Sequence, residues 1–152
     1  MNKSIRIGGA SGFWGDSYRA TEQLIQDTTL DFIVYDYLAE ITMSIMARAR
    51  AKSPSAGYAT DFIDAVIKPY IKRISTHNTR LISNAGGVNP EKCAEVISEL
   101  VKDLQLNLKV SCITGDDLMS SAQEIKNMNC KEMFSDIKFP ELDKVASMNA
   151  YL

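Results

Sequence analysis

The sequence has few of the residues that form disulfide frameworks, zinc sites and histidine-based catalytic centres. Its 152 residues include three cysteines, Cys93, Cys112 and Cys130, and one histidine, His77. Because the cysteines are odd in number and widely spaced, they predict buried reduced thiols rather than a disulfide framework or a zinc site. His77 follows a helical segment, where the helix dipole stabilises a positive charge, so a structural role is favoured over catalysis.

Charge of one sign and long apolar runs are also lacking. The formal net charge is −2 at pH 7, and lysine and arginine are scattered along the chain, so nucleic acid is not an expected partner. No apolar run approaches the roughly 20 residues of a membrane span, and the N-terminus lacks the apolar segment of a signal peptide. We therefore expect a cytoplasmic protein with no membrane partner.

Glycine is concentrated in two short segments. Residues 5–16, IRIGGASGFWGD, run from a short apolar strand into four glycines around two large aromatic residues. Residues 83–90, SNAGGVNP, have the same design. In both, glycine lets the main chain approach a ligand closely, and the helix that follows has free N–H groups that can face an anion. We expect the loops to line one pocket, with these candidate ligand-binding residues: Gly9, Gly12, Trp14, Gly15, Asp16, Asn84, Gly86, Gly87 and Asn89.

The first loop differs from a dinucleotide-binding loop. Gly9, Gly12 and Gly15 give the spacing G-x-x-G-x-x-G, whereas the dinucleotide motif is G-x-G-x-x-G. Phe13 and Trp14 also occupy the place where a pyrophosphate needs close approach. Nicotinamide or flavin binding is therefore disfavoured, and Trp14 is equally compatible with core packing and with stacking on a ligand.

Strand and helix patterns alternate along the chain. This alternation predicts an α/β fold, a three-layer sandwich with a mostly parallel sheet flanked by helices. Asn89 and Pro90 are typical of a helix start, and Pro69 should kink or restart the helix that contains it. The predicted strands are 5–7, 32–35, 81–82 and 106–112, with Cys112 in the core, and 145–152 is a possible further strand. The predicted helices are 16–26, 38–49 (Leu38, Ile41, Ile45 and Ala49 at helical spacing), 60–74 and 90–104.

Several acidic residues come at or just after predicted strand ends, where open α/β sheets bind their ligands. Asp36 and Glu40 follow the second strand, and Asp116 and Asp117 follow the fourth. Converging carboxylates need a cation or shared protons to offset their repulsion, and oxygen ligands suit Mg²⁺. These four residues are candidate catalytic residues, and Asp36 and Asp116 are candidate metal ligands. The alternative is that these residues and Asp16 cap helices or lie on solvated first turns. Asp61, at a predicted helix start, is likewise more typical of a cap or of the surface than of acid–base chemistry.

Five segments, IRIGGASGFWGD, DYLAE, GYATDF, NAGG and GDDL, occur in this order. Together they resemble the N-terminal part of the acyclic terpene utilisation family AtuA, over nearly the whole chain. The resemblance implies a place in the breakdown of citronellol- and geraniol-type isoprenoids through coenzyme A esters, without assigning catalytic residues. Family members are longer, so we expect residues 1–152 to form a single domain, the N-terminal part of a longer protein.

Two functions remain open at this point. The first is acid–base chemistry, assisted by Mg²⁺ if the carboxylates converge, on an acyl-CoA or small carboxylate. The second is a non-catalytic subunit that binds an acyl-CoA or a partner chain. For either function we expect the isolated chain to be inactive, and to form a homo-oligomer or to bind a complementing C-terminal chain.

Overall fold

The computed structural model describes residues 4–27 and 29–150. They divide into two compact units, Met1–Cys112 and Ile113–Leu152. The first unit holds the sheet and four of the α-helices, and the second holds short helical turns. Within the described residues, no helix is long and apolar enough to cross a membrane.

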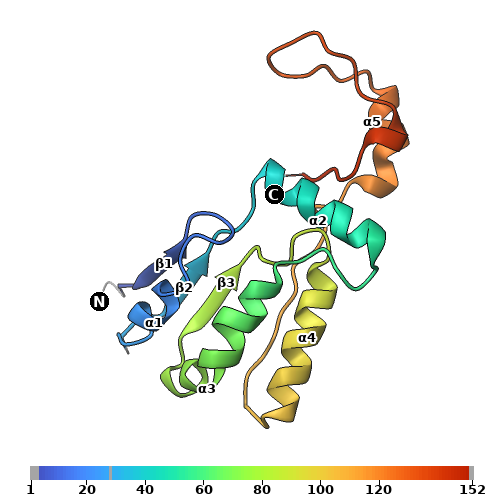
Figure 1. Cartoon of the computed structure of the whole chain (residues 1–152). Coiled ribbons are helices and arrows are strands. Elements are labelled where there is room, and N and C mark those ends of the chain that lie inside the picture. Colours follow the sequence, from blue (N-terminus) through green and yellow to red (C-terminus); the bar gives the residue numbers. More distant parts are fainter. Residues whose placement is uncertain (1–3, 28, 151–152) are drawn as a thin grey trace. The chain divides into compact units, whose positions relative to one another are not determined.

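The first unit is built on a three-stranded parallel sheet (Figure 1). The strands β1 (Ile7–Ser11), β2 (Phe32–Tyr35) and β3 (Arg80–Ser83) lie in the order β1-β2-β3. Phe32 pairs with Ile7 on one side and with Arg80 on the other. The predicted α/β class, with a parallel sheet flanked by helices, is confirmed, and so is the predicted second strand.

The helix after β1 is shorter than predicted. It is α1 (Ala20–Leu24), and its N-cap residue, Arg19, makes no side-chain cap hydrogen bond. The carboxylate of Asp16 does not cap this helix, because it accepts a hydrogen bond from the Gly12 N–H at 2.9 Å and so closes the preceding loop. The helix therefore begins only after the loop is complete.

The helix predicted around Pro69 changes type just before that residue. A π-helix, η1 (Phe62–Ile67), leads directly into α3 (Lys68–His77). Pro69 lacks an N–H group and clashes with a preceding α-helical turn, so it is best tolerated in the first turn of a helix. The predicted restart is confirmed, and the wider π-helical turns before Pro69 are the form that it takes.

The α2 helix (Glu40–Lys52) buries a different face from the one that its apolar spacing predicts. Thr42, Met46 and Ala47 are buried, whereas Ile41 is 72% exposed and Ile45 is 48% exposed. Met46 lies so close to Gly87 that a Cβ at that glycine would overlap its sulfur. The glycine loop thus determines which side of α2 faces the core.

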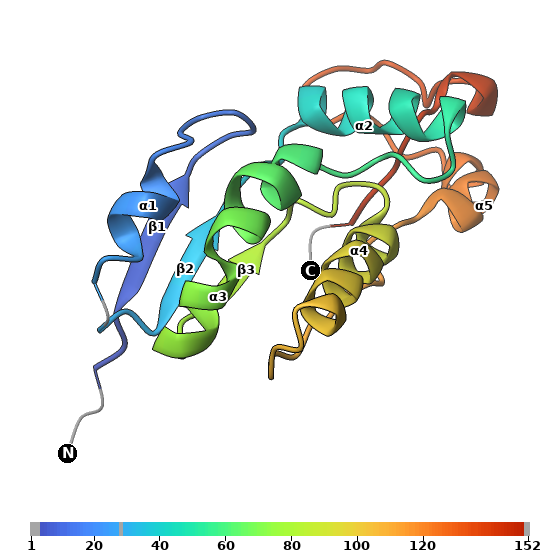
Figure 2. The ribbon, with the colours of Figure 1, turned by 60° about the horizontal axis from the view of Figure 1, so that its bottom comes forward.

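The helices α1 and α3 cover one face of the sheet (Figure 1 and Figure 2). Tyr35 of β2 contacts two elements on this face. Its hydroxyl is hydrogen-bonded with Thr21 Oγ1 of α1 at 3.0 Å, and its ring packs edge-on against Phe62 of η1. On the opposite face of the sheet, Ile7 and Ile82 are 61% and 51% exposed. Within the described residues this second face is largely uncovered.

The buried core joins the strands, η1, α3 and α4 (Pro90–Asp103), and includes Ala10, Ile33, Tyr35, Ile63, Val66, Ile67, Ile71, Cys93 and Val101.

The predicted fourth strand does not form in the described residues. Residues 106–112 carry no strand assignment, although Leu106, Leu108 and Val110 are half-buried against the core and alternate with exposed residues. Alternation reports which side chains are buried, whereas a strand also needs a neighbour with free hydrogen-bonding groups. Cys112 is exposed, so its predicted place in the core is wrong, and Cys130 is exposed as well, whereas Cys93 is buried as predicted.

The second unit contains η2 (Met119–Ser121), α5 (Ala122–Asn127) and η3 (Leu142–Lys144). Its two ends are joined by an isolated antiparallel bridge between Asp117 and Asn149. The Leu118 N–H donates to the Met148 carbonyl, and the Ala150 N–H to the Asp116 carbonyl, both at 2.8 Å. A further strand is predicted over residues 145–152. Of its described residues only Asn149 forms a β-bridge, and residues 151–152 lie outside the described residues.

Candidate functional site

Both glycine loops leave the same edge of the sheet. Because β1, β2 and β3 are parallel, their carboxyl ends lie at one edge, with β2 between the other two. Residues 12–18 follow β1, Asp36 and Tyr37 follow β2, and residues 84–89 follow β3. This is the edge at which open α/β sheets bind ligands.

Asp36 and Asn84 join the ends of β2 and β3. The Asn84 side chain donates from Nδ2 to Asp36 Oδ1 at 2.7 Å, and its Oδ1 accepts from the Tyr37 N–H at 2.7 Å. Ser11, at the end of β1, donates from Oγ to the Asp36 carbonyl at 3.2 Å. These contacts orient the exposed Asp36 carboxylate, with one oxygen engaged by an amide.

Of the glycines in the first segment, Gly8 is required by packing, because a Cβ there would lie 2.9 Å from Leu24 Cδ2, whereas Gly9 and Gly12 are not. A Cβ at Gly9 would meet nothing within 4 Å, and one at Gly12 would meet only an Asp16 carboxylate oxygen, at 3.9 Å. Gly15 differs, since its φ of +84° lies in the region that favours glycine. Gly9 and Gly12 therefore leave open space beside the main chain.

The glycines of the second loop serve internal packing. A Cβ at Gly86 would lie 2.7 Å from the Cα of Pro90, and one at Gly87 would lie 2.7 Å from the carbonyl oxygen of Gly57. Gly87 also has a φ of +54°. Its N–H donates to the Asn84 carbonyl at 3.1 Å, so this amide is already engaged.

Asn89 occupies the N-cap position of α4, but its side chain does not cap the helix. Its Nδ2 donates to the carbonyls of Pro54 and Ala56, at 3.0 and 2.8 Å, and the residue is buried. The Arg50 guanidinium donates to the carbonyl of Val88 in the same loop. Asn89 thus fixes the turn between α2 and η1 against the start of α4.

Trp14 links the first glycine loop to the start of the π-helix η1. Its indole Nε1 donates to Asp61 Oδ1 at 2.5 Å, and its ring is partly buried against the core. Asp61 lies immediately before η1. This hydrogen bond joins residues 47 positions apart and fixes one oxygen of the Asp61 carboxylate.

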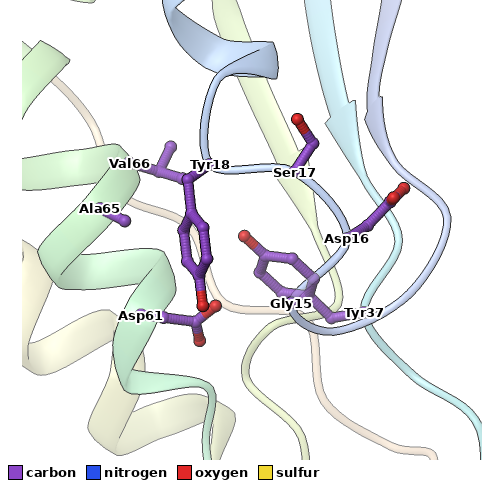
Figure 3. A pocket seen from close by; sticks show the side chains of 8 residues that line it. All are labelled: Gly15, Asp16, Ser17, Tyr18, Tyr37, Asp61, Ala65 and Val66. Carbon is purple, nitrogen blue, oxygen red and sulfur yellow. The ribbon is translucent and has the colours of Figure 1, made fainter.

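A pocket lies beside this hydrogen bond (Figure 3). Figure 3 shows the side chains of Tyr18, Tyr37 and Asp61 pointing toward one another. Tyr37 as a whole is only 5% exposed, but its hydroxyl oxygen is not among the buried polar atoms without a partner in the described residues, so solvent reaches it. Burial, together with the negative charge of Asp61, raises the pKa of Tyr37. The hydroxyl is therefore protonated at neutral pH and can donate to a ligand. The pocket is lined by Gly15, Asp16, Ser17, Tyr18, Tyr37, Asp61, Ala65 and Val66.

A family model described as acyclic terpene utilisation family protein AtuA matches residues 5–152. The chain belongs to this family. Membership supports a role in acyclic terpene catabolism and agrees with the resemblance of the five sequence segments. The comparisons with curated proteins and with solved structures found no match.

In this AtuA chain, six of the eight pocket residues were not among the predicted ligand-binding and catalytic residues, and these six include Tyr18, Tyr37 and Asp61. Tyr37 and Asp61 lie within the segments DYLAE and GYATDF, which carry the family resemblance, so a signal for them was present. Asp61 at a helix start is also typical of a cap, and Tyr37 after an apolar strand is typical of core. Tyr18 has no distinguishing pattern, because only the fold brings it beside Asp61.

The four predicted catalytic acids of this AtuA chain are divided between the two units. Asp36 and Glu40 lie in the first unit and are exposed, whereas Asp116 and Asp117 lie in the second unit. Asp116 Oδ2 accepts from Asn149 Nδ2 at 2.8 Å, and Asp117 Oδ1 accepts from the Met119 N–H at 2.9 Å. Within residues 4–27 and 29–150, no three His, Cys, Asp or Glu side chains form a group that could hold a metal ion. The Asp36–Asp116 metal site stays a prediction.

Proposed function

We propose that this AtuA-family chain acts in acyclic terpene breakdown on an acyl-CoA or small carboxylate, by acid–base chemistry at the carboxyl edge of its sheet. The observation that carries the proposal is the pairing of Tyr37 with Asp61 in one pocket. The ring of Tyr37 is buried, its hydroxyl is protonated at neutral pH, and both line the same pocket as the Asp61 carboxylate. Catalytic acids and bases commonly come in such pairs.

The two side chains divide the proton chemistry between them. Tyr37 holds its proton and donates it, or a hydrogen bond, to an oxygen of the substrate. Asp61 accepts a proton through the carboxylate, whose Oδ1 is held by the Trp14 indole at 2.5 Å. Trp14 is thus a positioning residue, and Tyr37 and Asp61 are the proposed catalytic pair.

The predicted loop residues have a supporting part in this proposal. The open space beside Gly12 admits the remainder of the ligand close to the main chain. Gly9 lies in register with Val34 and Ile82, so its open side belongs to the uncovered face of the sheet. Mg²⁺ at Asp36 belongs to the proposal only if the second unit brings Asp116 to it. A Tm that rises with Mg²⁺ in the wild type, and not in Asp36→Asn, supports this metal site.

A non-catalytic subunit is the second candidate, and the uncovered face of the sheet favours it. Parallel sheets are normally covered on both faces, and here Ile7 and Ile82 are exposed on one of them. We propose that this face packs against a second copy of the chain or a complementing C-terminal chain. Such a subunit would bind acyl-CoA without converting it.

Turnover measurements distinguish the two candidates. The coenzyme A esters of citronellic and geranic acid are incubated with the wild type, Tyr37→Phe and Asp61→Asn, and products are followed by mass spectrometry. We expect turnover by the wild type and a loss of about 10²-fold or more in each variant, with unchanged folding. Binding of the esters with no turnover contradicts the enzyme and supports the binding subunit.

A further inference from the structure

The uncovered face of the sheet is apolar in its middle and carries opposite charges at its two ends. Val34 and Ile82 are in register in the middle row. At the amino end, the Arg80 guanidinium lies over the Phe32 ring, 5.7 Å from its centroid. The exposed Asp36 carboxylate follows β2 at the carboxyl end. A segment that covers this face must therefore present apolar side chains between an acidic end and a basic end.

The α2 helix has an exposed stripe with this order of groups. Ile41 is 72% exposed and Ile45 is 48% exposed, and residues four apart lie on one side of a helix. Glu40 begins the helix, and Arg48 and Lys52 continue the stripe toward its end. These three charged residues are exposed, and none forms an ion pair within residues 4–27 and 29–150. The stripe is thus acidic, then apolar, then basic.

The spacing of the charges matches between the two surfaces. Helices that connect and cover parallel strands run antiparallel to them. From Glu40 to Arg48 the helix rises about 12 Å, at about 1.5 Å per residue. From the row of Phe32 and Arg80 to Asp36 the strand rises about 13 Å, at about 3.3 Å per residue. An antiparallel helix therefore brings Glu40 to Arg80 and Arg48 to Asp36, with its isoleucines on the apolar row.

We propose that the uncovered face of the sheet binds the α2 helix of a second copy of this chain, antiparallel to the strands. The chain's own α2 lies beyond the carboxyl ends of the strands, where Met46 packs against Gly87 (Figure 2), so the covering helix comes from another copy. The inference rests on the second-copy alternative of the proposed function and names the element that binds. It does not depend on the acid–base chemistry.

Mixing two variants tests the contact. Ile41→Lys places a charge in the helix stripe, and Ile82→Lys places one on the sheet face; both sites are exposed, so each variant should fold. We expect each alone to self-associate about tenfold or more weakly than the wild type, measured by sedimentation velocity. The mixture should associate again, because Ile41→Lys keeps an intact sheet face and Ile82→Lys keeps an intact helix. A fluorescent label on one variant identifies the mixed complex.

Charge reversal tests the orientation of the helix. Glu40→Arg and Arg80→Glu should each weaken self-association about two- to tenfold, and the double variant should recover it. Lys72→Glu, on the exposed side of α3, is the control and should have no effect. Circular dichroism and thermal unfolding check that each variant is folded.

Three results would overturn the inference: a wild type that stays monomeric, undiminished association of folded Ile41→Lys, or a mixture that associates no better than its components. Loss of association in Ile82→Lys but not in Ile41→Lys overturns the α2 contact and leaves the second-copy alternative standing. A monomeric wild type removes both. Turnover of the coenzyme A esters is measured separately, so the enzyme proposal can fail while the α2 contact holds.

Discussion

Single side chains at the edge of the sheet have structural roles that their sequence positions do not predict. Asn89 follows a glycine turn and precedes Pro90, which is typical of a helix cap. In the structure its amide instead bridges the carbonyls of Pro54 and Ala56. The capping pattern fixed the helix start correctly, but the direction of the side chain depended on a turn more than thirty residues away.

Replacing Asn89 tests this bridge. Asn89→Ala leaves two carbonyls of the turn without their donor in a buried place, so we expect the free energy of unfolding to fall by about 1–3 kcal/mol. Chemical denaturation measures it. Asn107→Ala is the matched control, because Asn107 is exposed and makes no side-chain hydrogen bond within the described part of the chain. Equal stability of the two variants would show that the bridge is unimportant.

Tyr37 shows where prediction of the site reached its limit. The sequence predicted that functional groups would gather after the strands, and Asp36, at the end of β2, points to that edge. The adjacent Tyr37 was hidden, because an aromatic residue after an apolar strand is typical of core. Only the fold shows that its ring is buried while its hydroxyl faces a pocket.

At the scale of elements, the two glycine loops look alike in sequence but differ in structure. The first leaves open space at Gly12, and the second fills the space at Gly86 with Pro90. We therefore expect Gly12→Ala to change the free energy of unfolding by less than about 0.5 kcal/mol. Gly86→Ala should lower it by about 1–3 kcal/mol, because a Cβ would overlap the main chain of Pro90.

The same pair separates ligand binding from folding. Gly12→Ala narrows the open space, so it should weaken binding of a coenzyme A ester while leaving the unfolding curve nearly unchanged. Parallel denaturation and calorimetric titration of both variants measure this. If Gly12→Ala destabilises the chain as much as Gly86→Ala does, the open space at the first loop is itself part of the packing.

Helix and strand patterns predicted the local conformation of a segment better than they predicted what the segment packs against. Two local predictions are confirmed: a helix forms after Asp36, and the side chains of residues 106–110 alternate between half-buried and exposed. The predicted buried face of that helix and the predicted strand at 106–112 are wrong, because both depended on neighbouring segments. The α2 helix turns Met46 inward to meet the Gly87 loop, and the segment 106–110 finds no strand partner among the described residues.

At the scale of the whole molecule, the order of elements was the most predictable feature. Alternating strands and helices predicted a parallel sheet and the edge where the loops gather, but not the strand order β1-β2-β3. Successive right-handed crossovers in one direction place their helices on one face. Local patterns do not say what covers the other face, where Ile7 and Ile82 are exposed.

Association of the purified chain tests the role of that face. An exposed apolar face on a parallel sheet favours association, so light scattering should show a mass that rises with concentration. Ile82→Lys should reduce this rise without lowering stability, since Ile82 is already 51% exposed. Lys72→Ala, on the exposed side of α3, serves as the control. A wild type that stays monomeric at high concentration contradicts a self-associating face.

The most direct test of the central claim, that the pocket beside Trp14 is the functional site, is a crystal structure of the chain with a bound terpenoid ligand. We expect an oxygen of the ligand within hydrogen-bond distance of the Tyr37 hydroxyl and of the Asp61 carboxylate, with the Trp14–Asp61 bond retained. A ligand bound elsewhere, with no contact to the Tyr37 hydroxyl, would contradict the account.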